Sequence, residues 1–135
     1  MDTVSAERRS EIMSRVRGAH TAPELAVRRL IHGLGYRFRL HRRDLPGRPD
    51  LVFPGRHKVI FVHGCFWHRH RRCALARMPK SRVEFWRLKL EGNAKRDDRN
   101  ERALRRAGWG VMSIWECQTR DIARLAGRIG RFLDA

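Results

Sequence analysis

Four side chains that favour soft or borderline metal ions are closely spaced in this sequence. Cys65, His70 and Cys73 follow one another as Cys-x₄-His-x₂-Cys, and Cys117 comes directly after a later apolar segment. If the strands that precede Cys65 and Cys117 are neighbours, the four residues can form a Cys₃His tetrahedron, which is typical of a closed structural zinc site. Four protein ligands leave no open position, so such an ion would not be catalytic. Alternatively, the cysteines are ordinary small core residues, since buried free cysteine is common.

A second set of residues could hold a hard cation and activate water. Asp50 follows a Pro-Gly-Arg-Pro turn, His63 ends an apolar run, and His68 lies five residues later. A carboxylate suits Mg²⁺, which usually takes one or two carboxylates, water and substrate phosphate. A histidine beside a metal-bound phosphate can take a proton from the attacking water near pH 7. Glu24 is a possible second carboxylate, although a purely helix-capping role explains it equally well.

The hypothesis of a shared metal site is strengthened by position, because Asp50, His63 and His68 all fall at one edge of the predicted sheet. A lone aspartate at such a turn would more often be a turn residue. The remaining histidines have no such neighbours, and we interpret them as surface residues: His20, His32, His41 and His57.

Two large aromatic residues, Phe66 and Trp67, lie inside the proposed zinc loop. A small loop tied to a metal has little room to bury both rings, so at least one should be exposed. Exposed apolar wedges on a basic protein can insert between base pairs, and a mismatched step is opened more easily. Trp86 could help if its helix faces the loop. Alternatively, the rings pack over the zinc site as a small core. Trp109 and Trp115 alternate within a predicted strand, and we assign them to the main core.

The first part of the chain carries helix signals. Residues 4–17 have the pattern of a short, basic amphipathic helix or arm. Thr21 can cap a second helix, with Pro in its first turn and Glu24 at the third helical position of a capping box. Gly35 should end this helix.

The later helices have similar signals. A second capping box, Ser81-x-x-Glu84, opens a long helical stretch that should end at Gly108, and Gly92 should kink or divide it. Thr119 should cap the last helix. Its expected core stripe is Ile122, Leu125, Ala126, Ile129 and Leu133.

Four segments have the pattern of β-strands. Residues 36–41 alternate apolar and basic side chains, which is typical of a half-buried strand. Residues 50–53 follow a rigid turn, 58–62 form a near-continuous apolar run like a central strand, and 109–115 form a fourth strand. The order α-β-β-β-α-β-α predicts one α/β domain over residues 1–135, with a mixed central sheet flanked by helices.

The charge of the chain indicates its class of partner. Lys and Arg number 31 against 14 Asp and Glu, so the formal net charge is +17. So large an excess indicates a polyanion or a membrane surface. The basic residues run through every segment instead of one helix face, which favours nucleic acid. The odd number of cysteines argues against a disulfide framework, and no segment resembles a membrane span or signal peptide. We therefore expect a cytoplasmic nucleic-acid-binding protein.

Several motifs in this order look like those of the very short patch repair (Vsr) DNA mismatch endonucleases. They are LPGRPD at residues 45–50, FVHGCFWH at 61–68, EFW at 84–86, Asn93 with Arg96-Asp97, GW at 108–109 and WEC at 115–117. Order and spacing match from about Arg9 to Cys117. The Gly-Cys-Phe-Trp-His string after a Pro-Gly-Arg-Pro-Asp turn is highly specific, so the resemblance is strong.

The resemblance implies a restriction-endonuclease-like fold (the PD-(D/E)xK superfamily) whose Mg²⁺ site departs from the usual acidic-x-Lys pattern. It implies that Asp50 is the central Mg²⁺ ligand and that the backbone carbonyl of Val62 is a second ligand. It implies that His68 is the general base, that Asp97 orients His68, and that His63 stabilises the phosphate or leaving group. Glu24 would be a further active-site acid. The matching zinc ligands are Cys65, His70, Cys73 and Cys117. The matching DNA contacts are the intercalating Phe66, Trp67 and Trp86, with Arg48 and a clamping basic segment, residues 1–18.

Enzymes of this family nick one strand on the 5′ side of the thymine in a T·G mismatch, which arises when 5-methylcytosine deaminates. The resemblance therefore implies double-stranded DNA as substrate and a functional link to a cytosine-5 DNA methyltransferase and mismatch repair proteins. It also implies a bacterial enzyme that is associated with the nucleoid when on DNA, and a monomer suffices for an asymmetric lesion. One departure is the Arg-rich segment after His68, where family members can be rich in His.

Two alternatives stay open. A zinc-stapled DNA-binding module without catalysis would keep the charge and the Cys/His cluster, but would not need Asp50, His63, His68 and Asp97 together. A nuclease of the same fold with another lesion or site preference would keep all of these residues.

Overall fold

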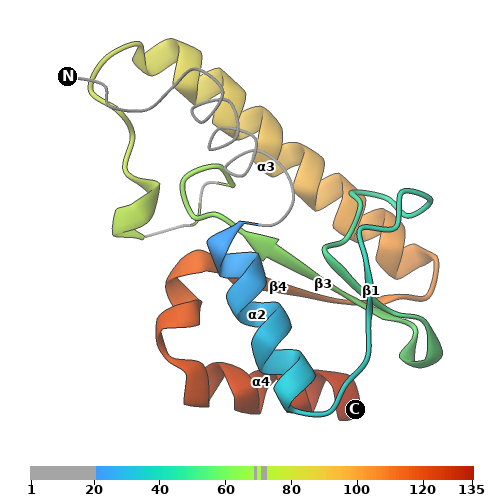
Figure 1. Ribbon diagram of the computed structural model, residues 1–135. Helices are drawn as coiled ribbons and strands as arrows, with labels where there is room; N and C mark the ends of the chain where they lie inside the picture. The colour runs from blue at the N-terminus through green and yellow to red at the C-terminus, as the bar shows by residue number, and fades with distance from the viewer. Residues whose placement is uncertain (1–20, 69, 71–72) are drawn as a thin grey trace, which may run out of the picture.

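The computed structural model describes residues 21–68, 70 and 73–135, so the predicted basic segment 1–18 lies outside the described residues. A four-stranded sheet separates α2 and α4, on one face, from the long helix α3 on the other (Figure 1). The elements are α2 (Ala22–Gly33), β1 (Arg39–Leu40), β2 (Leu51–Phe53), η1 (Pro54–Arg56), β3 (Lys58–His63), η2 (Ala74–Ala76), α3 (Val83–Arg106), β4 (Gly110–Trp115), η3 (Glu116–Arg120) and α4 (Ile122–Asp134). The predicted order of helices and strands and the mixed sheet are confirmed for these residues.

The strand order brings several strand ends together. The sheet has the order β1-β2-β3-β4, in which β1–β2 and β2–β3 are antiparallel and β3–β4 is parallel. Consequently β1, β3 and β4 all end at the edge where β2 begins. We call this edge the site edge, because Asp50, His63 and the segments that carry the cysteines lie there. This topology confirms the predicted convergence.

The core has two parts, one on each face of the sheet. On one face, buried residues of α2 and α4 pack on buried residues of β2, β3 and β4. The members of this cluster are Val27, Ile31, Leu51, Phe53, Ile60, Met112, Ile114, Leu125, Ile129 and Leu133. On the other face, Leu104 of α3 packs on Val52, Val59, Phe61 and Val111. Because β3 is covered on both faces, it is apolar almost throughout, as a central strand should be.

The predicted strand 36–41 is wrong in most of its length. Only Arg39 and Leu40 pair with β2, and both are exposed. Tyr36 and Phe38 pack against the α2–α4 core without joining the ladder. The physical reason is that β2 has only three residues, so it offers few backbone partners to a longer neighbour.

Two predicted helix starts are also wrong. The second long helix begins after Arg82, whose φ is 55°, and no side chain caps it. Ser81 is therefore one residue too early for a capping box, and the Glu84 carboxylate pairs with Arg87 instead. The last helix is capped by Asp121, whose carboxylate accepts the N–H of Arg124 at 3.2 Å.

The remaining helix expectations have mixed outcomes. Thr21 caps α2 as predicted and accepts the N–H of Glu24 at 3.4 Å. Gly35 also ends the helix as predicted, because it follows the C-cap residue Leu34 with φ 96° and its N–H donates to the carbonyl of His32 at 3.0 Å. Gly92 does not divide α3, which is one continuous helix of 24 residues. The single glycine costs about 1 kcal/mol, which the rest of so long a helix outweighs. In α4, Leu125, Ile129 and Leu133 are buried, whereas Ile122 is 45% exposed. None of the helices in the described part of the chain is long and apolar enough to cross a membrane.

Candidate active site and metal centre

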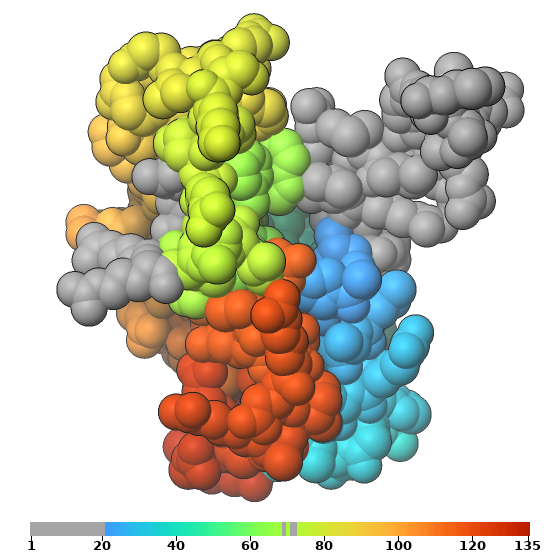
Figure 2. All heavy atoms as spheres, turned by 90° about the vertical axis from the view of Figure 1, so that its left-hand side faces the viewer, coloured from blue at the N-terminus to red at the C-terminus, as the bar shows by residue number. Residues whose placement is uncertain are grey.

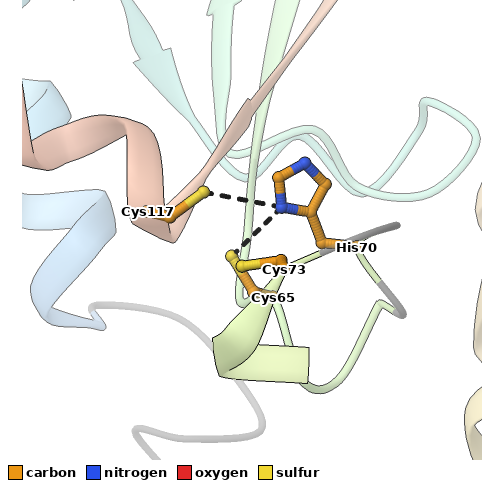
Figure 3. A group of neighbouring side chains, drawn as sticks. All are labelled: Cys65, His70, Cys73 and Cys117. Atoms are coloured by element: carbon orange, nitrogen blue, oxygen red, sulfur yellow. Dashed lines mark hydrogen bonds between the residues drawn. The ribbon is translucent and has the colours of Figure 1, made fainter. Parts of the chain in front are cut away.

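The Cys/His cluster lies at the site edge of the sheet. Cys65 follows β3, His70 and Cys73 come from the next loop, and Cys117 lies in η3 directly after β4 (Figure 3). The Nδ1 atom of His70 lies 3.5 Å from the Sγ atoms of both Cys65 and Cys117. The four potential ligand atoms all lie within 4.8 Å of one another. The parallel pairing of β3 with β4 therefore brings the distant Cys117 to the other three, as the sequence predicted.

The spacing of these atoms fits a tetrahedral metal ion. With Zn–S near 2.3 Å and Zn–N near 2.0–2.1 Å, neighbouring N and S ligands of an ideal tetrahedron lie about 3.6 Å apart. The two observed N–S distances of 3.5 Å agree with this value. Burial raises the pKa of the Cys65 thiol to about 12. Its thiolate would therefore need a bound cation, and a coordinating thiol is deprotonated by its metal.

Asp50 lies at the start of β2 and accepts a hydrogen bond from the neighbouring strand. The N–H of Val62 donates to its Oδ2 at 2.7 Å. Burial raises the pKa of Asp50, and the Val62 hydrogen bond and the nearby His41 lower it in part. A partly desolvated carboxylate of this kind gains from a bound cation, which is the property expected of a metal ligand.

His63, His68 and Asp97 form a third cluster on the side of the sheet that faces α3. Their potential ligand atoms lie within 4.8 Å of one another. Nδ1 of His68 hydrogen-bonds to the Asp97 carboxylate, and the rings of His63 and His68 have centroids 4.1 Å apart. All three line a cavity of about 430 Å³ that also includes Phe61 and Trp115. A site of this shape can admit a small polar group or a phosphate.

The two histidines differ in environment. His63 is 7% exposed. Burial, together with a smaller contribution from the adjacent His68, lowers its pKa to about 4. His63 is therefore neutral near pH 7 and can donate a hydrogen bond, but it offers no positive charge. His68 is more accessible, and its Nδ1 is taken by Asp97. This arrangement leaves Nε2 as the atom that can accept a proton.

Glu24 is buried beside Asp50, although it belongs to the first turn of α2. Its carboxylate forms an ion pair with Arg28 and lies 3.1 Å from Nε2 of His41. His41 Nε2 also lies 3.6 Å from Oδ1 of Asp50. Burial lowers the pKa of His41, while Asp50 raises it in part. The prediction that Glu24 joins the acidic site is thus supported by its position, and the interpretation of His41 as a surface residue is wrong.

The predicted wedge residues contact one another. Phe66, Trp67 and Trp86 stack edge to face, with centroids 5.2 to 5.9 Å apart. All three residues are half-buried, so the expectation that at least one ring of the loop would be exposed is wrong. Trp86 lies on α3, which therefore does face the loop. Figure 2 shows the start of α3 and the chain before it (yellow to yellow-green) at the upper end of one face, with η3 and α4 beside α2 below.

The predicted DNA contact Arg48 and the two tryptophans that we assigned to the core differ in their environments. Arg48 is exposed, with φ 48° in the turn before Asp50. Trp109 is half-buried against the Leu104 cluster and stacks on His57, at a centroid distance of 3.9 Å. Trp115 is not an ordinary core residue, because it stacks on His70 at 4.2 Å.

Comparisons with known proteins agree with the motifs. A model of the DNA mismatch endonuclease Vsr family matches residues 1–75. The chain is also 42% identical over 117 residues to the DNA mismatch endonuclease Vsr of Escherichia coli (strain K12), covering 87% of this chain and 74% of that protein. This chain belongs to the Vsr family. It is 52% identical over 133 residues to the type II nicking enzyme V.XorIIP of Xanthomonas oryzae pv. oryzae, covering 98% and 97% of the two chains. It is 34% identical to the type II nicking enzyme V.NmeAIP of Neisseria meningitidis, over 98% of this chain and 94% of that enzyme.

As a member of the Vsr family, the protein is a DNA endonuclease, and this excludes the alternative of a DNA-binding module without catalysis. Asn93 and Glu116 belong to the motifs quoted above, but the sequence did not predict their roles, and it did not single out Arg28 or His41. Asn93 of α3 donates to the carbonyl of Trp67 at 3.2 Å and so fixes the aromatic loop to the helix. Glu116 accepts the N–H of Cys65 at 3.3 Å. Arg28 could have been found four residues after Glu24 on one helix face, whereas no local signal distinguished His41.

Proposed function

We propose that this protein nicks one strand of double-stranded DNA on the 5′ side of the thymine of a T·G mismatch, using Mg²⁺. The observation that carries the proposal is the convergence of Asp50, His63, His68 and Asp97 at one edge of the sheet in a strongly basic member of the Vsr family. The proposed fold is that of the restriction-endonuclease-like (PD-(D/E)xK) superfamily, in one domain over residues 1–135. A monomer is sufficient because the lesion is asymmetric.

Asp50 and the carbonyl of Val62 would hold the Mg²⁺. Leu51 pairs with Ile60, so two residues further in the same register Val62 lies opposite Pro49. A hydrogen-bonded residue of an antiparallel ladder directs its N–H and its C=O to the same neighbouring strand. The Val62 N–H reaches Asp50, whereas Pro49 has no N–H to offer the carbonyl. The carbonyl oxygen is therefore directed to the Asp50 side with no ladder donor opposite it, which supports it as a ligand.

The proton transfer would be carried by the histidines. A bound Mg²⁺ would polarise the scissile phosphate and stabilise its developing charge. The Nδ1–H of His68 donates to Asp97, so Nε2 has the free lone pair that takes a proton from the attacking water. His63, which is neutral because it is buried, would donate an N–H to a phosphate or leaving-group oxygen. Glu24 would act as a further acid beside Asp50.

The Cys/His cluster would hold a structural Zn²⁺. Three thiols and one imidazole are the donor set of closed zinc sites, and the N–S distances of 3.5 Å match tetrahedral coordination. The cluster ties the loop after β3 to η3, and this loop carries the aromatic residues and His68. Zinc would therefore fix the part of the chain that is proposed to meet the DNA.

The DNA would be held by charge and opened by aromatic side chains. Phe66, Trp67 and Trp86 form one contiguous aromatic group that could wedge into a mismatched step, which costs less to unstack than a paired one. Arg48 and the basic segment 1–18 would contact phosphates. The net charge of +17 predicts binding that weakens steeply with salt. A functional link to a cytosine-5 DNA methyltransferase and to mismatch repair proteins belongs to the same proposal, as does a place in the bacterial cytoplasm, on the nucleoid.

The test uses end-labelled duplexes that carry T·G, T·A or C·G at one position within randomised flanks, with Mg²⁺. A nick 5′ to the mismatched thymine is expected, and Asp50→Ala should abolish it while leaving DNA binding largely intact. Wild-type nicking by Asp50→Ala would refute the metal assignment.

A second candidate is a nicking enzyme that acts in another context. It is favoured by the 52% identical relative, which is a type II nicking enzyme. Cleavage of the paired duplexes at the same rate as the T·G duplex would select this candidate and reject mismatch recognition.

A further inference from the structure

One residue of the site edge, His41, is placed next to the proposed metal ligands by the register of the sheet. Leu40 pairs with Leu51, so the next pair in this ladder is His41 with Asp50. The N–H of His41 indeed donates to the carbonyl of Asp50 at 3.4 Å. Residues opposite each other in an antiparallel pair have neighbouring side chains. The proximity of this imidazole to Asp50 is thus built into the backbone.

The side chains of His41, Asp50 and Glu24 converge on one small volume. Nε2 of His41 lies 3.1 Å from Oε1 of Glu24 and 3.6 Å from Oδ1 of Asp50. One ligand atom from each of the three residues lies within 4.8 Å of the other two. Ligands at right angles on a cation with bonds of about 2.1 Å lie about 3 Å apart. The 3.1 Å separation fits two ligands at right angles, and the 3.6 Å separation corresponds to a wider angle of about 120° at the same ion.

The surroundings of the cluster orient it. Arg28 forms an ion pair with Oε2 of Glu24, which leaves Oε1 as the oxygen that faces His41. The Glu24 side chain is 2% exposed, whereas those of His41 and Asp50 are 23% and 20% exposed. The cluster is thus rigid on the α2 side and accessible on the other. Among the described residues, two carboxylates and one guanidinium give this cluster a net charge of −1, which a divalent cation and a DNA phosphate would balance.

We propose that His41, bound through Nε2, and Glu24 are further protein ligands of the metal centre beside Asp50 and the Val62 carbonyl, and that the His41 nitrogen makes the centre bind Mn²⁺ more tightly than Mg²⁺. The inference rests on the proposed metal centre at Asp50. Its physical basis is that Mg²⁺ is a hard ion that prefers oxygen, whereas imidazole nitrogen suits transition metals better. The alternative is that His41 only hydrogen-bonds to Glu24 and Asp50 and orients them.

The experiment measures Mn²⁺ binding by electron paramagnetic resonance on full-length protein preloaded with one equivalent of Zn²⁺. The loss of the free Mn²⁺ signal gives the dissociation constant, addition of Mg²⁺ gives the competition, and electron spin echo modulation reports nitrogen bound directly to Mn²⁺. In the wild type we expect nitrogen modulation. In His41→Gln it should be lost, with Mn²⁺ affinity lowered by about tenfold or more and Mg²⁺ competing correspondingly better.

The matched control is His32→Gln. His32 is exposed on α2, so this variant carries the same substitution at a histidine outside the cluster. It should keep the wild-type Mn²⁺ affinity and modulation. His41→Asn serves as a second variant should His41→Gln fail to fold. Unchanged nitrogen modulation and Mn²⁺ affinity in a folded His41 variant would overturn the proposal. Asp50→Asn separates the proposal about His41 from the proposed metal centre on which it rests. If this variant binds Mn²⁺ as tightly as the wild type, the assignment of the metal centre to Asp50 is wrong.

Discussion

The hydrogen bond between His68 and Asp97 leads to the sharpest prediction about catalysis. The Asp97 carboxylate can only accept, so it fixes the proton of His68 on Nδ1 and leaves Nε2 free to act as base. In Asp97→Asn, the side-chain amide can turn its NH₂ toward Nδ1. The imidazole would then carry its proton on Nε2, and the base would be lost without any change in side-chain size.

The expected loss follows from the contribution of a positioned general base. Such a group accelerates a reaction by about 10²–10⁴-fold, which corresponds to about 3–5 kcal/mol of transition-state stabilisation. The low end applies if the Asn oxygen stays toward Nδ1 and only the negative charge is lost. The high end applies if the amide turns over and reverses the tautomer, as in a serine-protease triad.

The assay is single-turnover nicking of the T·G duplex with saturating enzyme, together with equilibrium DNA binding. We expect the nicking rate of Asp97→Asn to fall by about 10²–10⁴-fold while the DNA dissociation constant changes little. The control is Glu91→Gln, which removes the same charge from a residue of α3 outside the cavity, where the carboxylate pairs with Arg87. A wild-type rate in Asp97→Asn, or an equal loss in Glu91→Gln, would refute the role of the His68–Asp97 pair.

Three further predictions concern zinc, stability and ionisation. Cys117→Ser should lose its bound zinc, as measured by elemental analysis. Its free energy of unfolding should fall by several kcal/mol, because metal binding contributes directly to folding. A metal-free variant of unchanged stability would contradict the zinc assignment. Leu104→Ala should lower the free energy of unfolding by about 2–5 kcal/mol in denaturant titrations, because Leu104 is fully buried between α3 and the sheet, while the zinc content stays constant. Tyr36 is the single tyrosine, and its hydrogen bonds to Asp134 raise its pKa. Its stabilising contribution is thus complete below pH 10 and lost as the pH rises through the folded-state pKa. Absorbance titration of the phenolate should show this raised pKa in the wild type and an ordinary one in Asp134→Asn, and identical titrations would contradict it.

Much of the candidate site could be predicted because its residues lie at strand ends. Periodicity located β3 and β4, and residues that follow two parallel strands must meet at one edge of the sheet. This reasoning brought Cys117 to the Cys65 loop. Asp50 meets His63 at the same edge because β2 runs antiparallel to β3, so its start lies beside the end of β3. Asp97 could not be found in this way. It lies in the middle of a long helix, and only the resemblance to the Vsr family assigned it to His68.

The missed features depend on register and on competition between local signals. His41 reaches Asp50 only because β1 pairs with β2 in one particular register, and no pattern in residues 36–41 specifies this pairing. The capping signal at Ser81 failed because the helix begins after Arg82, and the Thr119 hydroxyl donates to the carbonyl of Glu116 instead of capping α4. Such short polar side chains satisfy several backbone geometries equally well.

Trp115 lies between the Cys/His cluster and the cavity bordered by His63. This position determines which measurement can test the zinc prediction. Its indole stacks on His70, a member of the Cys/His cluster, with an interplanar angle of 9°. The same ring lies 5.0 Å from that of His63, which borders the catalytic cavity. A displaced His70 would therefore leave the Trp115 ring without its stacking partner, and a shift of this ring would disturb the neighbouring His63. Loss of nicking in Cys117→Ser would follow whether zinc acts in folding or in chemistry, so zinc content and the free energy of unfolding are the readouts that identify a structural ion.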